Sequence, residues 1–168
     1  MTKDQFLNDS HQSQIFFRKV RYDDCDQLLE WANDPVTRKN SFNTELIEKK
    51  THSQWLKSKL EDPNTIFLLF YLENNVPLGQ VRIVKSEYVN EISVAVNPEK
   101  RGSGYGGKIL TLAIEYYYKR WCFDPIVAYI KPSNNSSLKV FEAVGFINVG
   151  KTHFKGFPCI ELIKYKNE

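Results

Sequence analysis

The chain has 168 residues, of which 42% are hydrophobic and 14% aromatic, enough for the core of one domain but cramped for two. Its formal net charge is +3 at pH 7, and acidic and basic residues are interspersed. The charges form no basic stripe and no arm that would bind a membrane, so we expect no nucleic-acid or membrane partner. The small excess of positive charge suits an anionic cofactor.

Cysteine and histidine spacing gives no sign of a metal site. The chain has three of each, scattered, and no CxxC or HExxH motif. We therefore expect reduced, mostly buried thiols and no bound metal. Residues 1–14 lack the features of a signal or transit peptide and read as a polar tail before a single domain at 15–168. No apolar run reaches the roughly 18 residues of a membrane helix, so we expect a cytoplasmic protein.

The first elements of the domain are a strand and a helix. The residues at Ile15–Val20 predict a short strand. The helix that follows is capped by Asp23 or Asp24 and ends at or just before Pro35. The polar stretch Val36–Asn43 is expected to be a loop.

A second helix and three strands follow. The helix is predicted over Thr44–Leu60, with its first residue as the N-cap. Thr65–Glu73 reads TIFLLFYLE and is strongly strand-like, and after an Asn-Asn turn Leu78–Lys85 is the returning strand. Glu91–Asn97 adds the next strand.

The C-terminal half alternates helices with strands. We expect a helix at Lys108–Trp121, a strand at Pro125–Lys131, a helix at Asn134–Val144, and closing strands near Phe146–Phe154 and Cys159–Tyr165. The order β-α-α-β-β-β-α-β-α-β-β places the chain in the α/β (α+β) class, with about seven strands and about four helices.

The most informative segment joins the strand at residue 91 to the helix after it. It reads EISVAVNPEKRGSGYGG and ends at residue 107. Its four glycines, Gly102, Gly104, Gly106 and Gly107, let main-chain N–H groups approach an anion without interference from a Cβ atom. The helix points its free N–H groups and the positive end of its dipole at the same loop. The segment therefore predicts a phosphate-bearing cofactor.

Two phosphate-binding motifs fit the letters but not the context. Gly102–Gly107 satisfies GxGxxG, yet in a dinucleotide-binding fold the first glycine directly follows the strand, and here residues 97–101 intervene. The same letters approach a P-loop, but Ile109 stands where that motif needs Ser or Thr to hold magnesium. Both alternatives are therefore weak.

A third motif fits the flanking residues as well. Val94 and Val96 lie on a strand, Pro98 follows, and Arg101–Gly106 reads RGSGYG. This combination closely resembles the acetyl-CoA signature of the GNAT N-acetyltransferase superfamily, RxxGxG/A after a VxVxP strand, and the predicted element order is the one that GNAT proteins have. The resemblance implies a single mixed, mostly antiparallel sheet flanked by helices, acetyl-CoA as cofactor, and direct acetyl transfer to a small-molecule amine in a ternary complex.

The resemblance also implies which residues hold the cofactor. Val94 and Val96 offer main-chain pairing to the pantetheine arm, where the third and fourth strands of a GNAT fold splay apart. The Arg101 side chain adds charge near the phosphates. Main-chain N–H groups are expected to hold the pyrophosphate at Arg101, Gly102, Ser103, Gly104, Tyr105 and Gly106.

A second family motif lies at residues 134–146, NNSSLKVFEAVGF. It resembles the GNAT pattern NxxA(I/L)xxYExxGF, in which the asparagine contacts CoA and the tyrosine often donates a proton to the departing thiolate. Asn134 matches the asparagine, with Ser137 and Phe141 beside the cofactor, but Phe141 stands at the tyrosine position and cannot donate a proton. The alternative proton donors are Ser136, Ser137, Tyr129 and water. Of these, Ser136 is taken as the catalytic candidate.

Glu91 is the best candidate for a general base. It heads the strand that faces the acetyl group in the resembled fold, where a carboxylate often acts through a water. Ser93 lies on the same face because side chains alternate along a strand. His52 is a weaker candidate, since a single histidine on a helix is more often structural.

The segment from Trp31 to Leu56 carries the acceptor prediction. It reads WxNDPxxRxxSFN and later HxxWL. Within the superfamily it resembles acetyltransferases that modify the 4-amino group of a UDP-linked 4-amino-4,6-dideoxy sugar in pseudaminic acid synthesis. The resemblance implies a sugar nucleotide bound by Arg38, Asn40, Ser41, Phe42, His52 and Trp55.

Other readings of the acceptor stay open. A protein N-terminus, as in acetyltransferases of the ribosomal-protein type, and a polyamine are both alternatives, although a polyamine prefers an acidic pocket and Val36–Asn43 carries Arg38 and Lys39 and no acid. A non-catalytic acyl-CoA-binding module, a protein of another class, is conceivable because of Phe141. A homodimer is compatible with the general tendency of soluble enzymes.

Overall fold

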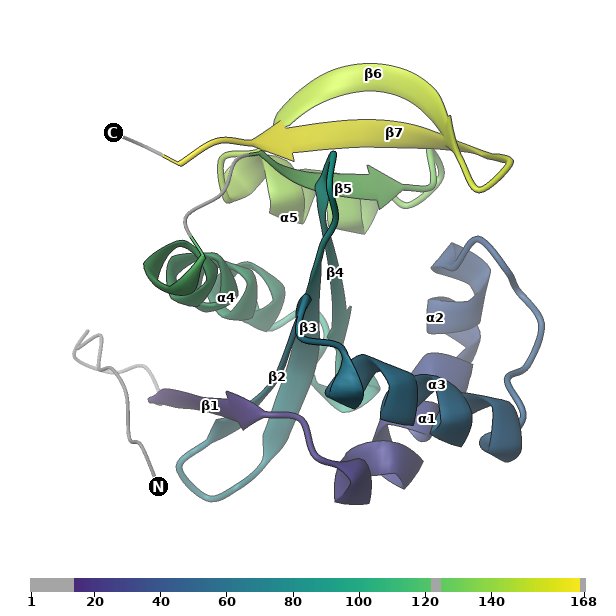
Figure 1. The fold of residues 1–168 in the computed structure, drawn as a ribbon, viewed down its shortest axis with the longest axis vertical. Helices are drawn as coiled ribbons and strands as arrows, with labels where there is room; N and C mark the ends of the chain where they lie inside the picture. The colour runs from purple at the N-terminus through teal and green to yellow at the C-terminus, as the bar shows by residue number, and fades with distance from the viewer. Residues whose placement is uncertain (1–13, 122–124, 167–168) are drawn as a thin grey trace.

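The centre of the protein is a seven-stranded sheet of order β1-β2-β3-β4-β5-β7-β6 (Figure 1). The computed structural model describes residues 14–121 and 125–166, so the predicted tail lies almost wholly outside the described part. The strands are β1 (Ile15–Lys19), β2 (Thr65–Leu72), β3 (Pro77–Lys85), β4 (Asn90–Val96), β5 (Ile126–Ile130), β6 (Ile147–Phe154) and β7 (Phe157–Lys164).

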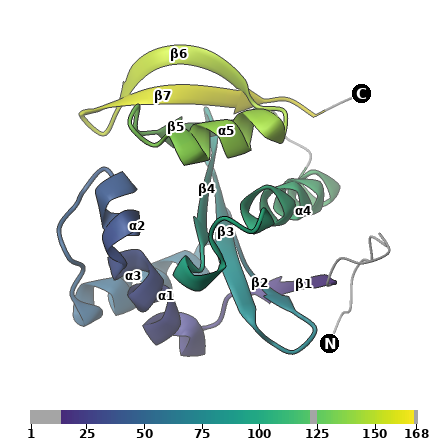
Figure 2. The same ribbon diagram turned by 180° about the vertical axis from the view of Figure 1, so that it is seen from behind.

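Helices flank this sheet on both sides (Figures 1 and 2). The α-helices among the described residues are α1 (Cys25–Asn33), α2 (Pro35–Asn40), α3 (Lys49–Glu61), α4 (Tyr105–Arg120) and α5 (Asn135–Ala143). Helices α4 and α5 lie on one side of the sheet, and α1, α2 and α3 lie on the other.

Strand pairing is antiparallel throughout, except between β4 and β5. Strands β1 to β4 form a meander, after which α4 crosses over and β5 joins β4 in parallel. The last strand, β7, lies between β5 and β6. This mixed, mostly antiparallel sheet confirms the predicted fold class.

Strand β2 is buried on both faces. Ile66, Leu68 and Phe70 join the core beneath α4, while Phe67 and Leu69 join a second core with residues of α1 and α3. Because both faces are covered, the strand is apolar along its length instead of alternating with polar residues.

The segment predicted as a loop after α1 is helical. Its first residue, Pro35, suits the start of a helix because a proline ring fixes φ and the missing N–H has no partner there. Asp34 caps the new helix by accepting a hydrogen bond from the Thr37 N–H at 2.9 Å. Pro35 therefore both ends α1 and starts α2.

Helix α3 starts later than predicted, and Thr44 is not its N-cap. Residues 41–48 are held in a non-helical path by side chains from α1 and α2. Arg38 donates to two main-chain oxygens of this segment, and Asn33 exchanges two hydrogen bonds of 2.9 Å with the main chain of Ile47. These tertiary bonds occupy main-chain groups that a helix would need.

Gly79 of β3 has no room for a side chain. A Cβ atom there would lie 2.5 Å from the Ala95 oxygen and 2.9 Å from Ile109 Cδ1. We predict that Gly79→Ala lowers the free energy of unfolding by about 1–3 kcal/mol, because the overlap pushes two paired strands apart. Gly107→Ala is the control, since its Cβ would meet only Val144 Cγ2, at 3.8 Å. Urea unfolding measures both variants, and equal midpoints would contradict the prediction.

Candidate active site

Strands β4 and β5 pair over only two residues. Asn90 lies opposite Ile126 and Glu91 opposite Val127, and within the described strands no pairing follows (Figure 1). Strand β3 stays paired with β4 as far as Val96, so the prediction that the third and fourth strands splay apart is wrong. Beyond Glu91 the main chain of β4 has no strand on its β5 side, which leaves N–H and C=O groups open to a ligand.

The loop after β4 leads directly into α4. The Asn97 side chain accepts from the Glu99 N–H at 3.1 Å and donates to the Pro77 oxygen at 2.8 Å, which fixes the end of the strand. Gly102 and Gly104 have φ of 76° and 77°, in the left-handed region that favours glycine. Helix α4 starts at the next residue, so its unpaired N–H groups and its dipole face the loop. This arrangement suits an anionic group.

The other two glycines lie inside the helix. Helix α4 begins at Tyr105 instead of Lys108, so Gly106 and Gly107 belong to its first turn. A Cβ atom at Gly106 would meet the Val96 side chain at 3.5 Å, an ordinary contact. Backbone conformation therefore favours glycine at two of the four positions, whereas the other two leave room for a Cβ atom.

The Arg101 side chain ties the glycine-rich loop to α2. Its Nη2 atom lies 2.7 Å from Asp34 Oδ2 and donates to Thr37 Oγ1 at 2.7 Å. The hydrogen bond from Arg101 holds the pKa of Asp34 below its ordinary value. The Arg101 charge, which was expected near the phosphates, is thus already paired with the Asp34 carboxylate.

A cavity of about 450 Å³ opens beside β4 and β5, where these two strands separate. Its lining comes from β3, β4 and β5, from the end of α2 and the segment after it, from α5 and its N-cap, and from the β6–β7 hairpin. The predicted site residues that line it are Asn40, Ser41, Phe42, Glu91, Ser93, Val94, Asn134, Ser137 and Phe141. Cofactor and acceptor candidates that are far apart in the sequence therefore share one space.

Aromatic rings form one wall of this cavity. Phe42 packs against Phe154 and Phe157, with ring centroids 5.6 and 5.9 Å apart. Tyr129 of β5 stacks on Phe154 at 4.3 Å. Burial raises the pKa of Tyr129, and nearby carboxylates raise it further, so the phenol keeps its proton at neutral pH. This aromatic wall packs the segment after α2 against the β6–β7 hairpin.

Arg38 and Ser136 do not line the cavity. The Arg38 guanidinium donates to the Ala32 oxygen and to Ser41 Oγ as well as to the segment that follows, and burial lowers its pKa. Ser136 is exposed and donates to Asn134 Oδ1 at 3.1 Å. Arg38 thus braces the polar lining from outside, and Ser136 belongs to the start of α5.

His52 and Trp55 also lie outside the lining. The His52 side chain is buried, its ring lies 5.2 Å from that of Trp55, and burial lowers its pKa so that it is neutral at pH 7. Trp55 packs edge-on against Phe67 at 6.0 Å. The Trp55 ring carries the guanidinium of Arg82 on its face, 4.9 Å from the ring centroid. Trp55 therefore contributes to the cavity indirectly, by packing against Arg82.

Sequence reasoning missed three cations that line the cavity: Arg82, Lys131 and Lys155. They come from β3, the end of β5 and the β6–β7 turn, so no local motif joins them. Only Arg82 has a sequence feature that points to the site, because it alternates with buried apolar residues in β3. Its cross-strand partner in β4 is Ser93.

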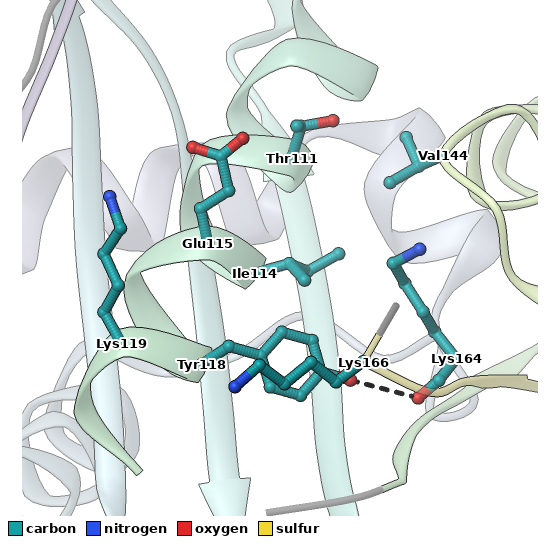
Figure 3. Close-up of a pocket in the computed structure, with 8 residues that line it drawn as sticks. All are labelled: Thr111, Ile114, Glu115, Tyr118, Lys119, Val144, Lys164 and Lys166. Carbon is teal, nitrogen blue, oxygen red and sulfur yellow. Dashed lines mark hydrogen bonds between the residues drawn. The ribbon is translucent and has the colours of Figure 1, made fainter. Parts of the chain in front are cut away.

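A second hollow of about 530 Å³ lies on another part of the surface (Figure 3). It is lined by α4 and by the end of β7, where the Tyr118 hydroxyl donates to the Lys164 oxygen at 3.3 Å. No residue of β4 or of the glycine-rich loop lines it. The 450 Å³ cavity is therefore the candidate active site.

The described residues show neither a metal-binding cluster nor a membrane-spanning helix. No three His, Cys, Asp or Glu side chains gather there as metal ligands, and none of the helices is long and apolar enough to cross a membrane. Cys25 and Cys159 are buried free thiols, while Cys122 lies outside the described residues.

The open edge of β4, the glycine-rich start of α4 and the neighbouring cavity suit an extended, phosphate-bearing ligand with a second ligand beside it. The family model of the acetyltransferase (GNAT) domain matches residues 14–147. The chain therefore belongs to the GNAT acetyltransferase family. It is an acetyl-CoA-dependent N-acetyltransferase of the GNAT kind.

Solved structures share the fold at low sequence identity. The aminoglycoside acetyltransferase AAC(6')-Ib with ribostamycin and coenzyme A is 19% identical, with a TM-score of 0.79 over 90% of this chain and 93% of that one. A mutant of the spermidine N-acetyltransferase SpeG from Vibrio cholerae is 14% identical, with a TM-score of 0.75 over 89% and 92%. An uncharacterized protein from Bacillus halodurans is 18% identical, with a TM-score of 0.78 over 90% and 83%. A comparison with curated protein sequences gave no match.

Asp34 joins two elements of the site, since it caps α2 and pairs with Arg101. We predict that Asp34→Ala lowers the free energy of unfolding by about 2 kcal/mol, because both a cap and a charge-assisted hydrogen bond are lost. Asp26→Ala is the matched control, since Asp26 pairs with Lys49 at a distance of 2.8 Å while its side chain is 74% exposed. Denaturant unfolding compares the two variants. Equal losses would mean that the Asp34 contacts add no stability.

Proposed function

We propose that this protein acetylates the primary amine of an amino sugar carried on a nucleotide. The observation that carries the proposal is the charge of the acceptor cavity. Arg82, Lys131 and Lys155 line it together with one carboxylate, that of Glu91. Such a lining favours an acceptor with negative charge, which a nucleotide-linked sugar has in its phosphates.

The cavity also offers the surfaces that a sugar nucleotide needs. Asn40 and Ser41 present amide and hydroxyl groups for hydrogen bonds with sugar hydroxyls. Phe42 and Phe154 present aromatic faces to a sugar or uracil ring. These features support the resemblance to sugar-nucleotide acetyltransferases found in residues 31–56.

The residues present fit acetyl-CoA, which supplies an activated thioester carbonyl when bound. Main-chain N–H groups around Gly102 and Gly104, with the first turn of α4, would hold the pyrophosphate. The unpaired side of β4 at Val94 and Val96 would hydrogen-bond the amides of the pantetheine arm. Asn134 would orient the cofactor from the start of α5.

Glu91 is assigned the role of general base. It is half-buried, lines the cavity, and is the last residue of β4 that pairs with β5. An amine with a lysine-like pKa of about 10.4 costs roughly 4.6 kcal/mol to deprotonate at pH 7, whereas one near 7.7 costs about 1 kcal/mol. A sugar amine flanked by electron-withdrawing substituents lies toward the lower value, so a modest base suffices.

Tyr129 is assigned the hydrogen bond to the departing thiolate. Phe141 is 3% exposed, packs edge-on against Phe146 at 4.9 Å, and has no proton to donate. Among the alternative donors, Tyr129 and Ser137 line the cavity and Ser136 does not. The raised pKa of Tyr129 keeps a phenolic O–H available there.

Polycationic acceptors fit this cavity less well. Ribostamycin is bound to one structural neighbour, and another is a spermidine N-acetyltransferase. An acceptor with several ammonium groups would meet three cations and one carboxylate in the lining described here. Like-charge contacts of this kind disfavour binding.

A panel of acceptors tests the proposal. With acetyl-CoA and the full chain, we predict thiol release with a UDP-linked 4-amino-4,6-dideoxy sugar, and no comparable turnover of spermidine or of a peptide with a free N-terminus. Selective turnover of either of these would overturn the proposed acceptor. Binding of acetyl-CoA without thiol release from any amine would instead indicate a non-catalytic acyl-CoA-binding module.

Glu91→Gln tests the assignment of the base. We predict that kcat falls by about 10²–10⁴-fold and that the acidic limb of the rate profile disappears, because the amide takes no proton. The KM for acetyl-CoA should stay unchanged. Glu87→Gln is the control, since Glu87 is exposed beyond the end of β3. A normal rate with a normal pH profile in Glu91→Gln would exclude this role.

A further inference from the structure

Arg82 is held in the acceptor cavity by aromatic rings. It lies on β3 between Phe67 of β2 and Ser93 of β4, and it is half-buried. Its guanidinium carbon lies 4.9 Å from the ring centroid of Trp55 and 5.9 Å from that of Phe67. These faces fix the cation without using any of its hydrogen-bond donors.

The other half-buried arginines have oxygen partners. Arg18 makes a two-point pair with Asp24, at 2.7 and 2.8 Å. Arg101 meets the carboxylate that caps α2, and Arg38 donates to main-chain oxygens. The Arg82 side chain makes no hydrogen bond or ion pair with any residue that the structure describes, and its buried Nε atom has no partner there.

No carboxylate of the described residues bonds directly to this cation. A guanidinium stays charged under all ordinary conditions, and burying it without an anion is unfavourable. Glu91 offsets the burial of Arg82 only through its charge, without a direct hydrogen bond. Arg82 lines the cavity together with Ser93 and Glu91, where an acceptor would lie.

We propose that Arg82 binds an anionic group of the acceptor, a phosphate or a carboxylate, and that this contact selects the acceptor. A guanidinium fork fits either anion through two parallel hydrogen bonds. The inference rests on the proposed function for the site in which the acceptor binds. It adds that an acceptor without an anionic group is a poor substrate, whatever amine it carries.

Calorimetry on the full chain with acetyl-CoA present tests this role with three probes. UDP carries phosphates, D-galacturonate carries a carboxylate, and uridine carries neither. We expect uridine to bind at least about 10-fold more weakly than the better anion, and the better anion identifies the group that Arg82 binds.

Arg82→Met removes the charge but keeps an apolar stem against Trp55. We expect it to lose roughly 10- to 100-fold in affinity for the better anion, with acetyl-CoA affinity unchanged as proof of folding, and Arg82→Lys to restore part of the loss. Arg120→Met is the control, because Arg120 is exposed at the end of α4. Uridine affinity should be equal in all variants.

Two results would overturn the inference: anion affinity in Arg82→Met equal to that of the unaltered protein, or no affinity of the unaltered protein for either anion. Turnover separates this failure from failure of the proposed function. If no amino-sugar nucleotide is acetylated but anion affinity still depends on Arg82, the proposed function fails alone. If the amino-sugar nucleotide is acetylated with the same KM in Arg82→Met, the inference fails alone.

Discussion

The short parallel pairing of β4 with β5 is the constraint on which the rest of the structure depends. Buried Asn90 holds the two strands together at their start, with its Nδ2 donating to the Pro125 oxygen at 3.0 Å. After Glu91, β4 follows β3 while β5 follows β7, and the sheet opens. The opening exposes main chain for the cofactor and borders the acceptor cavity. Glu91 lies where the exposed main chain of β4 meets the cavity.

We propose that this protein binds anions with two different devices. At the start of α4, main-chain N–H groups and two left-handed glycines form a neutral cradle, and the nearby Arg101 is paired with Asp34. In the acceptor cavity, charged side chains do the corresponding work, led by Arg82. The partners of each arginine therefore decide its role: Arg38 and Arg101 brace the fold, whereas Arg82 keeps its donors for a ligand.

Local patterns predicted what local physics determines. The strand at Glu91, the glycine-rich loop and α4 follow from alternation, glycine conformation and helix period, so the elements that frame the proposed cofactor site could be predicted from sequence. The path of residues 41–48 was not, because tertiary hydrogen bonds from Asn33 and Arg38 override helix propensity there. The cations of the cavity were missed for a similar reason, because they come from separate elements. Arg82 and Lys155 meet only through the sheet order.

Backbone hydrogen exchange on the full chain, with and without acetyl-CoA, tests the central claim most directly, because it reports on the main-chain groups that the splayed strands leave open. We expect slower exchange of amides in β4 beyond Glu91 and in the first turn of α4, with the Thr111–Lys119 region unchanged. Slower exchange confined to the second hollow, around Thr111–Lys119 and Lys164, with none in β4, would contradict it.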